Sequence, residues 1–315
     1  MPLLVLWLSA CAPPPQVRPP TELMAVSVGP EDDLDELARR HLGSPSRKWI
    51  IKDFNQIDDV TVGQLVLIPR RNYRPGGLAP DGYQVVPVLA YPDLAAVKSE
   101  QASRIADRFR QQMEFIQTQG YNVVDIHQLI AFMNFKATLP PRAVVLTFDD
   151  QSRLFYDLIF PVLKSYQFTG TLFVSPATVG EESMVKWSQL REMMASGLRI
   201  QCRFLKADAA QLKPSPFPKR SRLAAVVSAL AADRIRIETI LSQPCPYLAY
   251  PDGQVAALMA LLAEKAGYQA GFNLVGGSNS FYRDVFAVRR TPVKWSEDLD
   301  QYRKHFEVFR KEALR

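Results

Sequence analysis

The sequence predicts an α/β protein in which a distorted (β/α) barrel follows a small β-α-α-β domain. Two patterns lead to this prediction. From residue 84 onward, seven short β-branched runs alternate with helical stretches, which is the order of a parallel sheet with helical crossovers. Within residues 25–69, an apolar run, two helical stretches and a second apolar run follow one another. A content of 47% hydrophobic residues is ample for both cores.

Length and charge limit the classes of protein that the chain can belong to. With 315 residues, it is long enough for about two domains. Its 38 Lys and Arg residues against 32 Asp and Glu give a net charge of +6. Because this excess is spread along the chain without a basic run, it favours an anionic envelope polymer as partner, and no nucleic acid is expected. No internal stretch approaches the roughly 20 uninterrupted apolar residues of a membrane-spanning helix.

Residues 1–11, MPLLVLWLSAC, form an apolar run followed by small residues and a cysteine, as at the end of an export signal. The L-S-A-C stretch resembles the lipobox of bacterial lipoproteins, in which the signal is cut before the cysteine and that cysteine carries the lipid. The resemblance implies that Cys11 is the lipidation site and anchors the protein to a membrane. No Lys or Arg follows Met1, so we expect the true translation start to lie upstream. The alternative is a buried N-terminal strand or helix with a chance cysteine.

Residues 12–24 are expected to form a Pro-rich tether. The stretch APPPQVRPP holds five prolines in nine residues, which favour extended polyproline II structure and a semi-rigid spacer. In lipoproteins of this kind, an Asp directly after the cysteine retains the protein in the inner membrane, and here Ala12 stands at that position. The resemblance therefore implies an outer-membrane lipoprotein that faces the periplasm.

The small domain begins its first helix after Asp32 and Asp33, which are N-cap candidates, and Gly43 ends that helix. Asn55 after the second helix and the closing stretch GQLVLIP at residues 63–69 resemble the hallmarks of a LysM module. The glycine-aspartate pair that is usual after the first strand is altered here. LysM modules bind glycans that contain N-acetylglucosamine, so the resemblance implies attachment to peptidoglycan.

Residues 70–83 are polar and rich in Gly and Pro, and are expected to form a linker to a large domain over residues 84–294. Its expected strands are the runs VVPVLAY, NVVDI, AVVLTF, GTLFVS, LRIQC, YLAY and AGFNL. Helices are expected near residues 100–119, 127–135, 154–166, 187–196, 221–242 and 254–266. This number of repeats predicts closure into a barrel, in which the chemistry lies where the strands end. An amphipathic helix over residues 295–315 is expected to dock through Phe306 and Phe309.

The motif VLTFDD at residues 145–150 ends an expected strand. Adjacent carboxylates point to opposite faces of a regular strand, so one must lie where the strand breaks into its loop, which lets one act as a base and the other as a metal ligand. By itself, a strand that ends in two aspartates is weak evidence of a site, because acidic residues commonly end strands in solvated loops. Together with VPVLAYPD, QGYNVVDIHQLIAF, FPVLKSYQFTGTLFV, KWSQLREMMASGLRI and YLAYPDG, in this order, it resembles the polysaccharide deacetylase family, carbohydrate esterase family 4, with its NodB-like distorted barrel. The resemblance covers about residues 84–293.

The resemblance implies a role for each aspartate: Asp149 matches the general base and Asp150 a metal ligand. Two histidines of an H-[ST]-x-x-H motif should complete the metal site, but Arg203 and Ala207 occupy their positions. Catalytic zinc normally needs three protein ligands and an open position for water. The chain has only three histidines, all elsewhere: His41, His127 and His305. We therefore expect no cofactor, and zinc or another divalent metal only if other groups complete the site.

Further positions depart from the family pattern. Gln151 replaces the usual glycine, and Asp252 replaces the middle residue of P-Y-G, whose N–H helps to hold the oxyanion. The sequence RRTPV at residues 289–293 stands where an L-x-H motif is usual. Cys202 beside the second aspartate would supply only one more metal ligand. Cys202 and Cys245 either pair in an oxidising periplasm or remain buried thiols.

Arg203 suggests what replaced the metal, because a guanidinium forks onto carboxylate oxygens. We expect Arg203 to pair with Asp150, with Asp149 as a second partner, and the alternative is that Arg203 points to solvent over the barrel rim. Side chains at strand ends are the candidates to line a remaining groove: Tyr91, Tyr250 and Asp252.

These features predict an envelope lipoprotein with a degenerate polysaccharide deacetylase domain, which binds or positions peptidoglycan or another N-acetylated glycan without catalysis. The rival is an active metal-dependent polysaccharide deacetylase with a rearranged site around Asp149 and Asp150. A third interpretation makes both domains protein-interaction modules without glycan affinity. The small number of metal ligands favours the first, whereas the family resemblance by itself favours the second.

Overall fold

The computed structural model describes residues 23–69, 77–79, 82–94, 97, 99–205, 220–250, 253 and 257–312. The chain divides into two compact units, Met1–Tyr73 and Arg74–Arg315. The predicted signal, the lipobox with Cys11 and most of the predicted tether lie outside the described residues. The same holds for Ala207 and Asp252.

The small unit has the predicted β-α-α-β order. Its elements are β1 (Leu23–Ser27), α1 (Leu34–Leu42), the 3₁₀ turn η1 (Pro45–Arg47), α2 (Lys48–Asn55) and β2 (Leu65–Pro69). The strands pair antiparallel, with Leu23 opposite Pro69. This pairing corrects the predicted boundary of the tether, because residues 23 and 24 belong to β1. Buried apolar side chains from both helices and from β2 form the core together with Val28, which directly follows β1: Leu34, Leu37, Ala38, Ile51, Val66 and Ile68.

Two polar residues hold the helices of the small unit in place. The Asp33 carboxylate accepts the N–H of Glu36 at 2.7 Å, so it caps α1 as predicted. Asn55 joins α2 to β2, because its amide nitrogen donates to the main-chain oxygens of Ile51 and Leu67, each at 2.8 Å. Its amide oxygen accepts the N–H of Leu67, also at 2.8 Å. The conspicuous Asn55 of the sequence is therefore a structural clamp.

Replacing this clamp in the Asn55→Ala variant is expected to lower the local opening free energy of the small unit by about 1.5 kcal/mol, since three hydrogen bonds are lost. Hydrogen exchange of the β1 and β2 amides in the full chain measures this change. The Asp58→Ala variant is the control, because this carboxylate is fully exposed and makes only a 3.6 Å ion pair with Lys52. Equal exchange rates in the two variants would contradict the clamp.

The large unit is built on a parallel sheet of nine strands in the order β12-β11-β10-β9-β8-β7-β5-β13, with β6 beside β7. The strands are β5 (Val88–Tyr91), β6 (Asn122–Val123), β7 (Ala143–Phe148), β8 (Thr171–Val174), β9 (Arg199–Arg203), β10 (Tyr247–Ala249), β11 (Ala270–Asn273), β12 (Val288–Arg289) and β13 (Thr291–Pro292). The two edge strands, β12 and β13, are separated in the chain by Arg290 alone. The chain thus steps from one edge of the sheet to the other, and the predicted distorted (β/α) barrel is confirmed as nearly closed.

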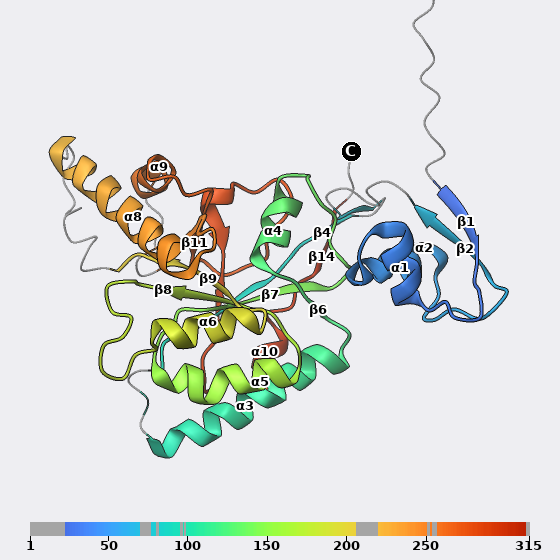
Figure 1. Cartoon of the computed structure of the whole chain (residues 1–315), viewed down its shortest axis with the longest axis horizontal. Coiled ribbons are helices and arrows are strands. Elements are labelled where there is room, and N and C mark those ends of the chain that lie inside the picture. The colour runs from blue at the N-terminus through green and yellow to red at the C-terminus, as the bar shows by residue number, and fades with distance from the viewer. Residues whose placement is uncertain are drawn as a thin grey trace, which may run out of the picture. The chain divides into compact units, whose positions relative to one another are not determined.

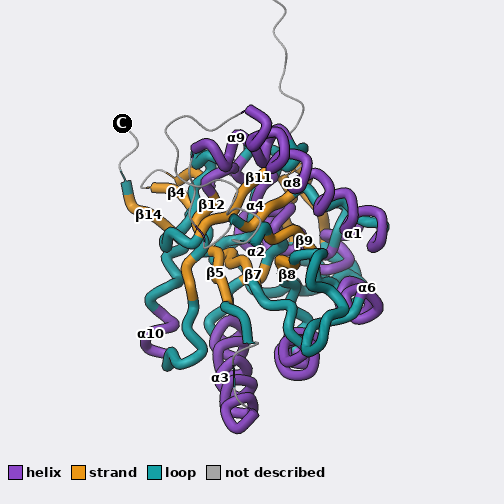
Figure 2. Tube along the Cα trace, turned by 90° about the vertical axis from the view of Figure 1, so that its left-hand side faces the viewer, coloured by secondary structure: helices purple, strands orange, loops and turns teal. Residues whose placement is uncertain are grey.

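Helices surround these strands. They are α3 (Ser99–Thr118), α4 (Ile126–Met133), the π-helical turn η3 (Phe155–Ile159) continuing into α5 (Phe160–Ser165), α6 (Trp187–Ala195), α8 (Arg220–Leu241), α9 (Ala257–Lys265), the turn η6 (Val285–Ala287) and α10 (Leu299–Arg303). Helices α3, α5 and α6 lie on one side of the strands and α8 and α9 on the other (Figure 1), and Figure 2 shows the strands at the centre. No helix in the described ranges is long and apolar enough to cross a membrane.

Alternation along the strands divides the core of the large unit in two. On β7, Ala143 and Val145 belong to an apolar cluster that also contains Phe173 and Phe272 from β8 and β11. The intervening Val144, Leu146 and Phe148 pack in a second cluster with side chains of the surrounding helices. Because side chains alternate with a period of two, the first cluster fills the barrel interior, and the position after Phe148 faces the interior again.

The predicted linker over residues 70–83 is wrong in its second part. Residues Leu78–Ala79 form β3 and Gly82–Gln84 form β4, which pair antiparallel with each other. Gly82 is required there, because a Cβ would lie 2.1 Å from the main-chain oxygen of Arg310. The polar, Gly-rich composition of this stretch does not indicate a strand, because β4 is stabilised by pairing with residues 309–311, more than 200 residues further along the chain.

The predicted C-terminal helix over residues 295–315 is also wrong. Helix α10 is short, and the chain then forms β14 (Phe309–Lys311), which pairs antiparallel with β4. Phe306 is buried and packs against Phe115 as predicted, whereas Phe309 remains 38% exposed. Pairing with β4 satisfies main-chain groups that a continued helix would have used within itself.

Cys202 and Cys245 are both buried, and no disulfide is found between them in the described part of the chain. Burial raises the pKa of the Cys245 thiol. The interpretation as buried thiols therefore fits the structure.

Candidate functional site

Charged residues from four places in the sequence meet at one edge of the barrel. Asp93 lies two residues after β5, Asp149 and Asp150 directly follow β7, Arg203 ends β9, and Arg290 lies between β12 and β13. Because these strands are parallel, their carboxyl ends share one edge, where functional groups of such barrels usually lie. The candidate site therefore combines three carboxyl groups with two guanidinium groups.

Asp149 forms a bidentate ion pair with Arg290. The Arg290 nitrogens Nη1 and Nη2 donate to the two carboxylate oxygens at 2.6 and 3.0 Å. The Arg290 side chain is fully buried, its Nε donates to the main-chain oxygen of Asn273 at 3.2 Å, and its guanidinium carbon lies 5.0 Å from the centre of the Phe173 ring. This fork fixes the Asp149 carboxylate at the top of the barrel interior, the face to which alternation along β7 assigns it.

Asp150 is a buried carboxyl group with one unsatisfied oxygen. Its Oδ1 accepts the N–H of Ser152 at 2.8 Å, whereas Oδ2 is buried without a hydrogen-bond partner. Burial raises the pKa of Asp150 to about 7; the Ser152 bond opposes this shift, and the nearby negative charge of Asp93 adds to it. This carboxyl group thus holds its proton well above the pH at which an exposed aspartate releases it.

The predicted ion pair between Arg203 and Asp150 is wrong: none is found among the described residues. Arg203 instead places Nη2 3.8 Å from the Asp93 carboxylate and donates through Nη1 to the main-chain oxygen of Asp149. Its side chain is 19% exposed, so it does not point freely into solvent either, and its Nε is buried without a partner. The Asp150 carboxyl group accepts the Ser152 N–H, and Arg203 forms its ion pair with Asp93 instead.

Asp93 and Arg290 are the two site residues that sequence reasoning missed. The stretch YPD directly after the first strand was the available signal for Asp93, since a strand end is where site residues gather. Arg290 follows a strand of only two residues, which no periodic pattern marks.

Tyr91 and Tyr250 do not line a groove, which corrects the prediction. Tyr91 is fully buried, and its hydroxyl lies 2.8 Å from the hydroxyl of Tyr302. Tyr250 is 2% exposed and donates to the main-chain oxygen of Phe286 at 2.9 Å. It packs over Gly271, where a Cβ would lie 1.9 Å from the Tyr250 hydroxyl oxygen. Both rings lie in the outer core because their strand positions face the helices.

Gln151 fills the position of the missing glycine without reaching into the site. Its amide oxygen accepts the N–H of Ser175 at 2.7 Å, and its amide nitrogen donates to the Thr178 hydroxyl. Gln151 therefore anchors the loop that follows β8.

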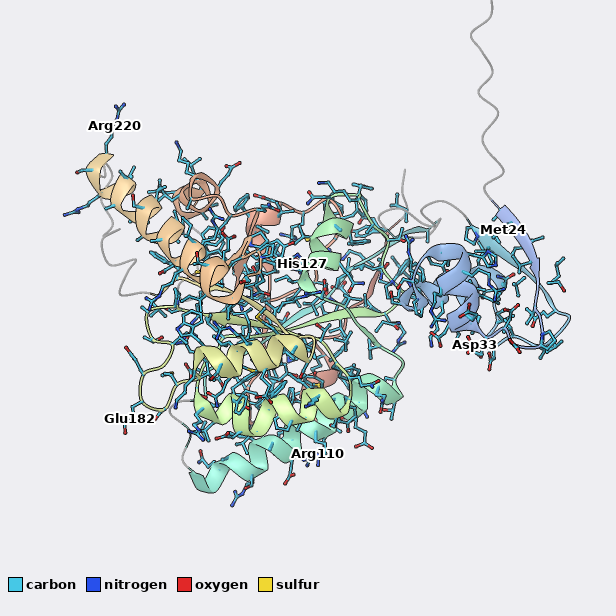
Figure 3. All side chains as sticks on the ribbon, in the orientation of Figure 1. Met24, Asp33, Arg110, His127, Glu182 and Arg220 are labelled. Carbon is cyan, nitrogen blue, oxygen red and sulfur yellow. The ribbon has the colours of Figure 1, made fainter. Side chains whose placement is uncertain are left out.

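None of the three histidines hydrogen-bonds to the two adjacent aspartates. His127, which Figure 3 labels, lies 3.0 Å from the hydroxyl of Tyr247, the first residue of β10, so it is at the amino ends of the strands. His305 pairs with Glu297 at 2.8 Å, and His41 is on α1 of the small unit. Within the described residues, no group of three or more His, Cys, Asp or Glu side chains is arranged to hold a metal.

The residues of the site do not fit the zinc that the resemblance implies. The unsatisfied Asp150 oxygen is a suitable ligand atom, but it is one ligand where a catalytic zinc site takes three. Arg203 is the end of β9, where the family places its first histidine, and its permanent positive charge opposes a cation beside it.

Comparisons with known proteins agree with this fold. A family model described as polysaccharide deacetylase matches residues 136–271. YxkH of Bacillus subtilis, named as a polysaccharide deacetylase, is 23% identical over 208 residues, which are 66% of this chain and 71% of that protein. The poly-β-1,6-N-acetyl-D-glucosamine N-deacetylase of Escherichia coli is 33% identical over 104 residues, 28% of this chain. The chain spans 16% of the length of that enzyme.

Solved structures resemble the large unit. The deacetylase PplD of Streptococcus pyogenes has a TM-score of 0.61 at 20% identity, covering 71% of this chain and 98% of that structure. IcaB of Ammonifex degensii has a TM-score of 0.58 at 25% identity, covering 68% and 94%. The nearly closed barrel is therefore of the NodB-like type, as the sequence predicted.

Proposed function

We propose that the large unit, which has a NodB-like barrel and resembles polysaccharide deacetylases over residues 136–271, binds an N-acetylated glycan without hydrolysing it. The relative that acts on poly-β-1,6-N-acetyl-D-glucosamine supports a polymer of N-acetylglucosamine as the class of ligand. The observation that carries the proposal is the state of Asp150: its buried carboxyl group has one unpartnered oxygen, and in the described part of the chain it belongs to no group of three or more His, Cys, Asp or Glu side chains that could hold a metal.

Chemistry supports recognition over hydrolysis. Hydrolysis of an amide needs an activated water, which a metal supplies by lowering the pKa of the bound water toward about 7. Here Arg203 occupies the place of a metal ligand, and Asp149 is held by Arg290.

The sequence supports a wider form of the proposal, an envelope lipoprotein that is anchored through Cys11 and held on peptidoglycan by a LysM-like small unit. The lipobox-like stretch before Cys11 and the GQLVLIP stretch at residues 63–69 are its support. A location at the outer membrane, facing the periplasm, follows from Ala12.

The second candidate is an active metal-dependent deacetylase, in which other groups complete the metal site. It is favoured by the 33% identity that 104 residues share with a named deacetylase. Hydrolysis of an N-acetyl group releases acetate, whereas binding of the glycan alone does not.

Acetate release from N-acetylglucosamine oligomers and from peptidoglycan, with added Zn²⁺ or Co²⁺, therefore tests the proposal. We expect no acetate above the level of the Asp149→Asn and Asp150→Asn variants, together with co-sedimentation of the full chain with insoluble peptidoglycan or poly-N-acetylglucosamine. Acetate that disappears in both variants would establish the enzyme instead. Absence of both acetate and co-sedimentation would leave the third interpretation, protein interaction alone.

A further inference from the structure

A cavity lies on the segment that follows β13. Val293, the next residue, donates its N–H to the main-chain oxygen of Ala90 on β5, so the segment leaves the barrel at the carboxyl edge. The Trp295 indole then donates to the main-chain oxygen of Pro92 at 3.0 Å, one residue before Asp93. The cavity has a volume of about 320 Å³ and is lined by Lys294, Ser296, Glu297, Gln301, Lys304 and His305. We name these six residues the α10 pocket.

The segment that forms the α10 pocket is held in position from both sides. Arg108 of α3 donates to the main-chain oxygen of Ser296. Asp298 and Gln301 form a capping box at the start of α10, in which the Gln301 side-chain oxygen accepts the Asp298 N–H at 3.2 Å. The pocket is thus part of the folded large unit.

The acceptor atoms of the pocket already have partners. The Glu297 oxygens accept the N–H of Lys294 at 3.0 Å and bond to Nε2 of His305 at 2.8 Å. Glu297 is 8% exposed, so its charge lies at the floor of the pocket. The Gln301 oxygen is used by the capping box.

The donor atoms of the pocket, in contrast, have no partner in the described part of the chain. Within the described residues, the side-chain nitrogens of Lys294 and Lys304 make no ion pair or hydrogen bond, and the same is true of the Gln301 amide nitrogen and the Ser296 hydroxyl. The pocket is therefore lined by two ammonium groups and two neutral donors without partners, whereas the Glu297 and Gln301 oxygens already accept hydrogen bonds. Such a set is complementary to an oxyanion, because each oxygen lone pair finds a donor and the charge is balanced.

We propose that the α10 pocket binds an oxyanion, a carboxylate or a phosphate, carried by an acidic glycan that crosses the carboxyl edge of the barrel. The inference rests on the proposed glycan binding, and it narrows the ligand class from N-acetylated glycans in general to acidic ones. The cavity volume is at the small end of ligand pockets, which suits one charged substituent or one sugar unit.

Binding of two oligosaccharides of equal length to the full chain, measured by calorimetry at low salt, tests the pocket. One is a neutral N-acetylglucosamine oligomer; the other is peptidoglycan stripped of its stem peptides, which carries a lactyl carboxylate on every second sugar. We expect wild-type protein to bind the acidic oligomer about tenfold more tightly, and the Lys294→Gln/Lys304→Gln variant to lose this preference while keeping its affinity for the neutral one.

The matched control is the Lys136→Gln/Lys164→Gln variant, which removes the same charge from exposed positions after α4 and in α5. Competition with inorganic phosphate and with acetate distinguishes the two kinds of oxyanion. If phosphate but not acetate displaces the acidic oligomer, the pocket is a phosphate site, and if both displace it, the pocket is a carboxylate site. Equal affinity of wild-type protein for the two oligomers would show that the α10 pocket does not bind an oxyanion, and the proposed glycan binding would be unaffected. Lack of affinity for either oligomer would overturn both.

Discussion

The Arg290→Met variant is expected to lose about 3 kcal/mol of unfolding free energy. Methionine has a similar length and remains compatible with the apolar interior around Phe173, so lost packing is small. The larger effect is that the Asp149 carboxylate, 16% exposed, keeps its charge without the fork that now binds both of its oxygens. Removing one partner of a buried ion pair typically costs about 3–5 kcal/mol, and partial exposure of Asp149 places this case at the lower end.

A double-mutant cycle with Asp149→Asn isolates the ion pair. The Asp149→Asn variant alone is also expected to be destabilised, because it leaves the fully buried Arg290 charge unpaired. The double variant contains neither charge, so it should be more stable than the sum of the single effects predicts, by about 2 kcal/mol. Urea unfolding of the full chain measures all three. Additive losses would show that the two side chains act independently.

The Asp150→Asn variant is expected to gain about 2 kcal/mol of unfolding free energy at pH 8. The wild-type carboxyl group has a pKa of about 7 in the folded protein, against 3.8 for an unperturbed aspartate. Between these two values the folded protein holds a proton that the unfolded chain has released, so wild-type stability falls as the pH rises from about 4 to about 7. The full shift corresponds to about 4 kcal/mol, and the unpaired amide hydrogens of the asparagine offset part of it.

Measurement of unfolding at several pH values tests this prediction. The Asp150→Asn variant should be less stable than wild type by about 2 kcal/mol at pH 4, where only the cost of the amide remains, and more stable by about 2 kcal/mol above pH 7. The Asp157→Asn variant is the control, because this carboxylate is 45% exposed and pairs with Arg153 on the surface. If Asp150 belongs to a working metal site, the opposite follows: with Zn²⁺ present, Asp150→Asn would lower the melting temperature relative to wild type.

Local patterns in the sequence determined most of the fold. Alternation of β-branched runs with helical stretches predicted the barrel, and the strand and helix ranges in the large unit follow it closely. In the small unit, Asp33 and Gly43 fixed the ends of α1, because capping depends on residues next to each other in the chain. The motif at residues 145–150 correctly placed two carboxyl groups at the end of a strand.

Only the tertiary structure decided how the charges pair and which strand ends are buried. Whether Arg203 meets Asp150 or Asp93 depends on side-chain directions set by strands far apart in the sequence, and the Arg290 fork arises from the step between the two edges of the sheet. Strand β14 depends likewise on a partner at residues 82–84. Periodicity and capping act over a few residues and can be read locally, whereas ion pairing and antiparallel pairing bring together distant residues whose local sequence does not encode the partner.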